Sequence, residues 1–224
     1  MGQPADATGD HSTMQLDVVK FAGILGQDED TRLLGDALPL DQLPRRSTRR
    51  LTRLERGVVA CLMGLDQACP NGLGDTTCVL ASRYGPMNHS LSLLDGLLEG
   101  DLLSPTAFSL SVHNAALGAA SQIISNHGGH TAVSAGEETL LAGLNECWSR
   151  LSDGLEQIVL VYSDLRLPDA YGAFDSAQLD VQFACLLRPG SDNRTSVTAH
   201  PGGNASRSLL EAFADGVKQV EWAL

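Results

Sequence analysis

A hydroxyl, an imidazole and an amide lie within four residues of one another in SPTAFSLSVHNAALG, residues 104–118: Ser111, His113 and Asn114. Serine and histidine side chains that meet can perform nucleophilic catalysis. The spacing predicts a helix over 112–125, and on a helix side chains two positions apart diverge by about 200°. No G-x-S-x-G motif surrounds Ser111. We therefore expect a structural role for this segment, with catalysis by Ser111 and His113 as the alternative.

Two adjacent carboxylates, Glu137 and Glu138, follow the small residues of TAVSAG. Paired carboxylates can serve general acid–base chemistry, but neighbours on a helix point about 100° apart. In the first turn of a helix they would stabilise its dipole, so capping is the favoured interpretation. Asp164 follows the apolar run QIVLVY. Two interpretations are equally compatible with the sequence. Asp164 is a functional residue at the carboxyl end of a strand, or it caps the turn that follows the strand.

The sequence shows no metal or nucleotide signature. His127 and His130 flank two glycines, but no third ligand is near, so a loop is expected there. A G-x-x-x-x-G-K phosphate loop is absent. The five cysteines form no C-x-x-C pair, and four lie in apolar patterns as buried thiols would: Cys61, Cys78, Cys147 and Cys185. We expect no cofactor and no metal.

The charge of the chain is uneven. The formal net charge of −12 disfavours nucleic acid as a partner, because phosphates would be repelled. Six arginines nevertheless fall within PRRSTRRLTRLER, residues 44–56. This run could dock an acidic protein surface, or it could form a solvated face paired with nearby Asp and Glu.

Hydrophobic periodicity predicts alternating strands and helices. Strands are expected at 16–25, 76–81, 131–135, 157–162 and 179–187, and helices at 52–68, 88–99, 112–125, 137–151 and 206–223, the last with Ser206 as its N-cap. Residues 26–50 are expected to be irregular. The pattern favours an α/β fold, a layered sheet covered by helices. We expect residues 1–13 to be disordered and residues 14–224 to form a single domain.

Composition supports this assignment. Hydrophobic residues make up 43% of the chain and aromatic residues only 4%, so the core should consist mainly of Leu, Val and Ala. The N-terminus lacks the pattern of a signal peptide, and no apolar run reaches the roughly 20 residues of a membrane helix. The cytoplasm is the expected compartment.

The order of the motifs resembles a known family. A strand ending in VLASRYG is followed by SPTxFxxSVHNAxxG, then by TAxSAGEExxxAGLxEC and by QIVLVYSD. This order resembles the short β-ketoacyl synthase-like proteins related to chain length factors, found in gene clusters for aryl-polyene and xanthomonadin-type pigments. The resemblance spans roughly residues 76–189 and implies a thiolase-like fold, as half of a ketosynthase. It also implies that the SPT-F-SVHNA segment, with Ser104, Pro105 and Thr106, contributes to a dimer interface beside an acyl pocket.

The chain departs from active synthases at the nucleophile. In such enzymes a cysteine occupies the elbow between a strand and a helix, and by the resemblance that position falls on Gly136. Glycine cannot form a thioester, and Glu137 would occupy the vacated acyl site. The chain also ends near the start of a synthase's second half, so the resemblance implies that the two basic residues promoting decarboxylation are missing.

These observations predict a non-condensing subunit of fatty acid or aryl-polyene-type biosynthesis that pairs with a β-ketoacyl synthase subunit or forms a homodimer. One alternative is a small acyl-thioester hydrolase or acyltransferase using Ser111 and His113. Another is a module that binds acyl carrier protein. The expected carrier-protein surface consists of Arg45, Arg46, Arg49, Arg50 and Arg53.

Overall fold

The computed structural model describes residues 13–26, 28–174, 180–191, 195–202 and 204–223. Eight strands form one sheet: β1 (Thr13–Leu25), β2 (Arg32–Gly35), β3 (Cys78–Ala81), β4 (His130–Val133), β5 (Ile158–Asp164), β6 (Val181–Pro189), β7 (Ser196–Thr198) and β8 (Gln219–Ala223). The α-helices are α1 (Arg45–Thr48), α2 (Arg53–Ala68), α3 (Met87–Glu99), α4 (Pro105–Ser109), α5 (Ala115–Ile124), α6 (Thr139–Ser152) and α7 (Ala205–Ala214). The 3₁₀ turns are η1 (Asp28–Asp30), η2 (Leu40–Gln42), η3 (Gly136–Glu138) and η4 (Asp169–Phe174).

The sheet is mixed, in the order β4-β3-β5-β6-β1-β8-β7, with β2 paired to β1. Strand β3 runs parallel to both β4 and β5, whereas β6 is antiparallel to β5 and to β1. Parallel strands need crossovers, and here α3 to α5 connect β3 to β4 and α6 connects β4 to β5. The fold class expected from the sequence, a layered mixed α/β sheet, is confirmed.

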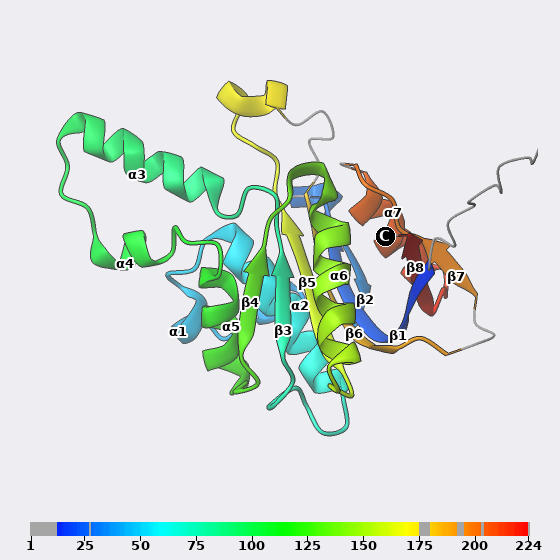
Figure 1. Ribbon diagram of the computed structural model, residues 1–224. Coiled ribbons are helices and arrows are strands. Elements are labelled where there is room, and N and C mark those ends of the chain that lie inside the picture. The colour runs from blue at the N-terminus through cyan, green and yellow to red at the C-terminus, as the bar shows by residue number, and fades with distance from the viewer. Residues whose placement is uncertain (1–12, 27, 175–179, 192–194, 203, 224) are drawn as a thin grey trace, which may run out of the picture.

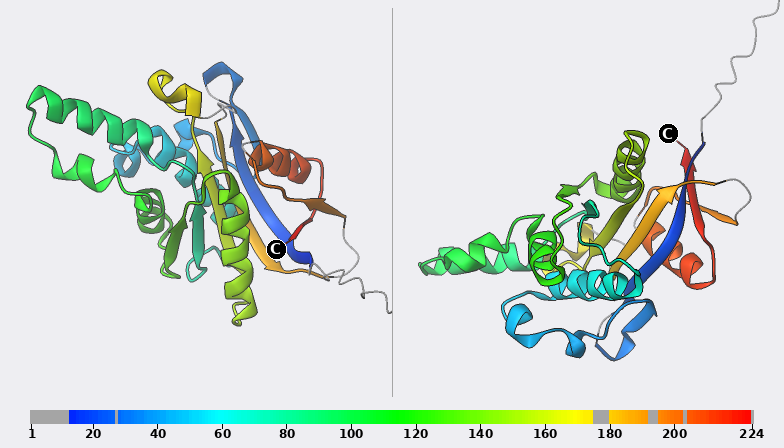
Figure 2. Two further views of the ribbon diagram at one scale, coloured as in Figure 1. Left: turned by 45° about the horizontal axis from the view of Figure 1, so that its top comes forward. Right: turned by 90° about the horizontal axis from the view of Figure 1, so that it is seen from below.

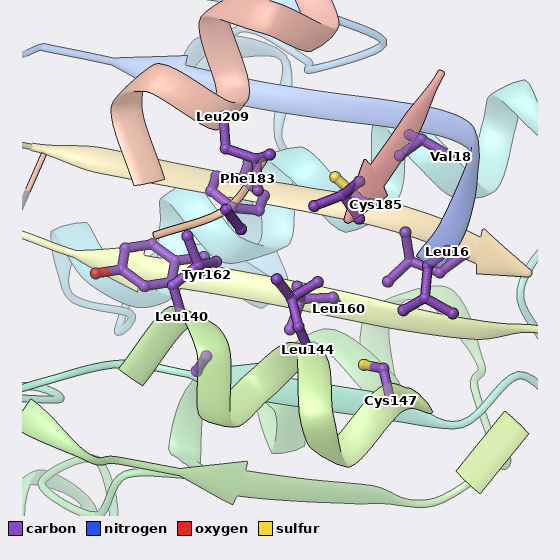
Figure 3. Close-up of a cluster of buried hydrophobic side chains, with 14 of the residues drawn as sticks. Leu16, Val18, Leu140, Leu144, Cys147, Leu160, Tyr162, Phe183, Cys185 and Leu209 are labelled. Atoms are coloured by element: carbon purple, nitrogen blue, oxygen red, sulfur yellow. The ribbon is translucent and has the colours of Figure 1, made fainter. Parts of the chain in front are cut away.

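Helices cover both faces of the sheet (Figures 1 and 2). Helix α2 begins with a capping box, in which the side chains of Thr52 and Glu55 each accept a hydrogen bond from the backbone N–H of the other residue. It packs with α5 on one face of the sheet. Helices α6 and α7 cover the other face. There Leu140, Leu144 and Cys147 face β5 and β6 (Figure 3). The core therefore lies in two layers around the sheet, built largely from Leu, Val and Ala as expected.

Helices α3 and α4 form an arm that extends away from the sheet (Figure 1). Neither helix has a buried residue. The arm holds itself together through His89, whose Nε2 donates to the carbonyl of Ala107 at 2.7 Å. Gly100, at φ +86°, ends α3 and turns the chain back towards α4.

The structure corrects three of the expected elements. The prediction of a helix over residues 206–223 is wrong beyond Ala214. The chain turns at Gly216 (φ +98°) and returns as β8 beside β1. Asn204, not Ser206, is the N-cap of α7. The segment 26–50, expected to be irregular, contains β2 and α1.

The remaining expected helices and strands are present with shifted ends, and β7 and α4 had not been expected. The expected disorder of residues 1–13 lies outside the described residues except at Thr13, which begins β1. In the described part of the chain, no helix combines the length and apolarity needed to cross a membrane.

Candidate functional site

The candidate site lies where three parallel strands end. Ala81 of β3 is in register with Val133 of β4 and with Tyr162 of β5, so the residues that follow meet at one edge of the sheet. Ser82 and Arg83 follow β3, residues 134–136 follow β4, and Asp164 ends β5. Such carboxyl-terminal edges are where open α/β sheets place their functional groups.

Asp164 is the centre of a buried ionic cluster. Its carboxylate accepts hydrogen bonds from the backbone N–H of Arg83 (2.8 Å), Arg83 Nε (2.6 Å), Ser82 Oγ (3.3 Å) and the Tyr162 hydroxyl (2.6 Å). The side chains of Arg83 and Asp164 are each 3% exposed. These four donors come from the end of β3 and from β5, so the carboxylate of Asp164 links the two strands. Capping of the turn after β5, one of the two roles expected from the sequence, does not describe these bonds.

Tyr162 is held as a neutral phenol in this cluster. Burial raises its pKa above the ordinary range, and the charge of Asp164 and the hydrogen bond to it raise the pKa further. A hydrogen bond with Ser206, a buried residue of α7, acts in the opposite direction. Ser206 therefore contributes to this cluster and not to the N-cap of α7 for which it was expected.

The elbow at Gly136 is exposed and open. Gly136 has φ +56°, in the left-handed region that favours glycine, and a Cβ there would meet no other atom within 4 Å. Thr139 braces the elbow, because its Oγ1 accepts from the N–H of Ala135 (2.9 Å) and donates to the carbonyl of Gly136 (2.7 Å). Ser134 Oγ donates to the carbonyl of Arg83 at 2.9 Å. The elbow is thus anchored to the ionic cluster.

Glu137 and Glu138 lie in η3, just before α6, and not in the first turn of the helix as expected. A carboxylate oxygen of Glu137 lies 3.5 Å from Nη1 of Arg83, although the Glu137 side chain is 61% exposed. Glu138 is the N-cap residue of α6 but makes no side-chain capping bond. The pair does not converge on a shared site, and Glu137 joins the exposed elbow to the buried arginine.

Ser111, His113 and Asn114 precede α5 instead of lying within a helix, so the angular argument for that helix does not apply to them. Ser111 Oγ donates to the carbonyl of Phe108 (2.8 Å), and His113 Nε2 donates to the carbonyl of Ser82 (3.0 Å). No hydrogen bond joins Ser111 to His113 among the residues described. His113 instead ties this segment to the end of β3, and Asn114 is the N-cap residue of α5.

The SPT motif forms the start of α4. Ser104 is its N-cap and accepts from the N–H of Ala107 at 3.4 Å, and Pro105 occupies the first helical position, where its missing N–H costs nothing. The carbonyl of Thr106 accepts a hydrogen bond from Ser109 Oγ. These residues shape the arm and lie away from the elbow.

The six arginines of the run 44–56 differ in their partners. Arg53 pairs with the buried carboxylate of Asp180 at 3.2 Å, and Arg56 Nη2 donates to the carbonyl of Leu40 at 3.4 Å. The other four predicted docking residues are exposed and make no ion pair within the described ranges: Arg45, Arg46, Arg49 and Arg50. Within the described ranges, Arg53 is the member of the run with an ion pair, and its partner Asp180 lies far from the run in sequence.

A cavity of about 360 Å³ lies at the base of the arm, between the starts of α2 and α3 and the loop that follows β5. Apolar side chains such as Met87 and Leu167 line it together with Arg53, His89 and Asp180. Gly136 does not line this cavity, so the elbow and the cavity are separate features of one edge.

The environment of the five thiols disfavours the thiolate form. Four cysteines are buried, and burial raises the pKa of each; that of Cys78 reaches about 12. Cys69 is half-buried, and burial raises its pKa as well. In the described part of the chain, His127 and His130 belong to no group of three or more His, Cys, Asp or Glu that could hold a metal ion.

Reasoning from the sequence missed three members of the ionic cluster: Ser82, Arg83 and Tyr162. A signal was available for the first two, since a serine and an arginine directly after a fully apolar strand fall at the same edge as Asp164. Tyr162 lies inside a strand and gave no such signal.

Comparison with known proteins identifies the family of the chain. The family model "Beta-ketoacyl synthase, N-terminal domain" matches residues 27–220. The chain belongs to this β-ketoacyl synthase family. No curated protein sequence matches the chain.

Solved structures share the ketosynthase fold. A chain of the ketosynthase (ApeO) in complex with its chain length factor (ApeC) from Xenorhabdus doucetiae aligns with a TM-score of 0.73 and 22% identity, over 91% of this chain and 92% of that one. A β-ketoacyl synthase from Burkholderia phymatum aligns with a TM-score of 0.56 and 12% identity, over 79% of this chain. The ishigamide ketosynthase/chain length factor aligns with a TM-score of 0.55 and 14% identity, over 80%. The alignment spans 59% of each of the latter two chains.

Proposed function

We propose that this chain is a non-condensing subunit, similar to a chain length factor, that pairs with a β-ketoacyl synthase and limits or shapes its acyl pocket. The observation that carries the proposal is the elbow after β4, where Gly136 offers no side chain to accept an acyl group. The five thiols supply no substitute, because burial raises the pKa of each and disfavours the thiolate that attacks a thioester.

The length of the chain is compatible with such a role. The aligned chain of the ApeO–ApeC complex is about as long as this one, since the alignment covers nearly all of both. A protein of this size therefore has a counterpart in a complex of ketosynthase and chain length factor. We propose an aryl-polyene-type pathway on the strength of the sequence motifs.

The edge of β4 is our proposed pairing face for the synthase. Strand β4 is the last strand on its side of the sheet, and its residues are half-buried or exposed. An edge strand presents N–H and C=O groups ready to pair with another chain. Arg150 of α6 holds this edge in place, because its Nη2 donates to Thr131 Oγ1 at 3.1 Å.

Two other roles stay predictions: hydrolysis or acyl transfer by Ser111 and His113, and docking of an acyl carrier protein on the exposed arginines. A cytoplasmic location is likewise our expectation. Of the two roles, hydrolysis or transfer lacks support from the hydrogen bonds of Ser111 and His113, which lead to backbone carbonyls.

Intact-mass spectrometry tests the absence of acyl chemistry. The purified protein is incubated with acyl carrier protein carrying a mid-length acyl chain, and we expect neither an acyl adduct nor loss of the thioester. Gly136→Cys is the matched positive control, because the Cβ meets no other atom within 4 Å and an exposed thiol there should accept an acyl group or an alkylating reagent. The left-handed backbone at φ +56° strains any residue with a Cβ, so circular dichroism first checks that this variant is folded. Acylation of the unaltered chain, or thioester loss abolished by Ser111→Ala, would overturn the proposal.

Pairing is tested separately by co-purification with a β-ketoacyl synthase encoded in the same gene cluster. We expect a stable complex, and Ala132→Pro in β4 should weaken it by removing a backbone donor from the free edge. Gly129 and Val133 accept hydrogen bonds from Cys78 and Ser82, so these residues face β3 and the N–H of Ala132 points away from it. If no complex forms with the unaltered chain, the pairing part of the proposal fails even if the chain proves catalytically inert.

A further inference from the structure

A second cavity, of about 390 Å³, lies between the start of α2 and the turn that follows β1. Its apolar lining comes from Ile24, Leu40 and Leu51, and its polar lining includes Arg56 and Gln182. A mainly apolar cavity of this size with a few fixed polar groups is typical of a site for a small molecule. Neither the elbow at Gly136 nor β4 contributes to its lining, so the cavity is separate from the features that carry the proposed function.

Arg56 is a half-buried cation without a carboxylate partner. Its Nη2 donates to the carbonyl of Leu40 at 3.4 Å, whereas its Nε is shielded from solvent and has no hydrogen-bond partner in the described part of the chain. The adjacent carboxylate of Glu55 accepts from the N–H of Thr52 at the start of α2. A partly buried charge without a counterion is unfavourable, so the guanidinium of Arg56 would be stabilised by an anion in the cavity.

The surrounding charges leave that position open to an anion. Arg53 also lines the cavity, but its charge is balanced by the buried carboxylate of Asp180 at 3.2 Å. Exposed carboxylates on the neighbouring turns make no ion pair with Arg56 within the described ranges: Glu29, Asp30 and Asp41. The cavity therefore offers one uncompensated positive charge, which suits a monoanion such as a carboxylate.

Gln182 supplies a fixed hydrogen-bond acceptor. It is 4% exposed, and its amide nitrogen donates to the carbonyl of Leu54 and to Ser163 Oγ, both at 2.8 Å. The amide oxygen accepts no hydrogen bond from the described residues. Gly57 of α2 makes room for this side chain, because a Cβ there would overlap the amide oxygen. Buried polar atoms are normally hydrogen-bonded, so this oxygen is suited to a hydroxyl donor from a ligand.

We propose that this cavity binds a small aliphatic hydroxycarboxylate. The carboxylate would lie against the guanidinium of Arg56, and the hydroxyl would donate to the amide oxygen of Gln182. The hydrocarbon would lie on Ile24, Leu40 and Leu51. Binding is non-covalent and uses neither the elbow nor the edge of β4, so the site can hold or fail independently of pairing with a synthase.

Isothermal titration calorimetry of the purified full-length chain with 3-hydroxyoctanoate tests the proposal. We expect saturable binding of one molecule. Octanoate, which lacks the hydroxyl, should bind about 10-fold more weakly, and octane-1,3-diol, which lacks the charge, about 10- to 100-fold more weakly. Absence of saturable binding would overturn the proposal. Equal binding of the three probes would overturn it as well, because it would show apolar contact alone.

Substitutions locate the site. Arg56→Gln should weaken binding of 3-hydroxyoctanoate by about 10- to 100-fold and leave that of the diol nearly unchanged, because only the carboxylate loses its partner. Arg49→Gln is the matched control, since Arg49 is an exposed arginine of the same run that does not line the cavity. Gln182→Leu should abolish the preference for 3-hydroxyoctanoate over octanoate.

A further variant keeps the test decisive if Gln182→Leu fails to fold, because that substitution also removes the donor to Leu54. Leu40→Trp places a larger side chain at a partly exposed position of the lining and should block the cavity. Circular dichroism checks that each variant is folded. Undiminished binding in folded Arg56→Gln and Leu40→Trp would show that the probe binds elsewhere and would overturn the proposal.

Discussion

Two neighbouring regions of this protein differ in whether their side chains are buried or exposed. At the edge where β3, β4 and β5 end, Arg83, Tyr162 and Asp164 are buried and satisfy one another. In the arm that leaves the same edge, leucines and a phenylalanine face solvent, and no residue of α3 is buried. The first region stabilises the folded chain by itself. The second contributes little to that stability, so its sequence is better explained by contacts made with another molecule.

The largest effect should come from removing the centre of the ionic cluster. Asp164→Ala leaves the guanidinium of Arg83 buried without its carboxylate, and breaking a buried pair in this way costs about 3–5 kcal/mol. Denaturation in urea measures the free energy of unfolding. Asp153→Ala, at the exposed end of α6, is the control and should change that free energy by about 0.5 kcal/mol or less. Equal, small losses in both variants would mean that the cluster does not stabilise the fold.

A second effect should appear at alkaline pH. The pKa values of the four buried thiols and of Tyr162 are raised in the folded chain, so these groups stay protonated where the unfolded chain loses protons. Their contribution is complete below the unfolded pKa values, about 8.5 for Cys and about 10 for Tyr, and is lost as the pH rises above them. Each ionising group should lower the free energy of unfolding by about 1.4 kcal/mol per pH unit.

Urea denaturation under reducing conditions at several pH values between about 8 and about 11 would measure this dependence. Among the five single Cys→Ser variants, Cys69→Ser should change the slope of the free energy of unfolding against pH least, because Cys69 is only half-buried. A free energy of unfolding that stays constant across this range would contradict the prediction and indicate that the thiols are accessible in the folded state.

The smallest effect should come from the arm. Leu98→Ser should change the free energy of unfolding of the monomer by about 0.5 kcal/mol or less, because this side chain is already 87% exposed. Leu144→Ala in α6 is the matched core variant and should cost about 2–5 kcal/mol, because Leu144 is buried against the sheet. Both are measured at high dilution, where self-association cannot contribute. A large loss in Leu98→Ser would show that the arm packs on its own body.

Much of the fold could be predicted because hydrophobic periodicity is a local property. The spacing of Leu54, Val58, Cys61 and Leu65 indicates α2, and the apolar run QIVLVY indicates β5. The prediction failed where distant partners decide the structure. Residues 219–223 form a strand because β1 offers an edge on which Val220 and Trp222 become buried, and no pattern within residues 206–223 contains that information.

The candidate site divides in the same way. The absence of a side chain at position 136 and the concentration of arginines in residues 44–56 follow from the sequence alone, because they depend only on which residues are present. Tertiary structure decided that Asp164 meets Arg83 and Tyr162, that His113 bonds a backbone carbonyl and not Ser111, and that the leucines of α3 stay exposed. Those outcomes depend on the parallel register of β3, β4 and β5 and on which surfaces the helices cover. Both arise from contacts between residues far apart in the chain, which local patterns do not record.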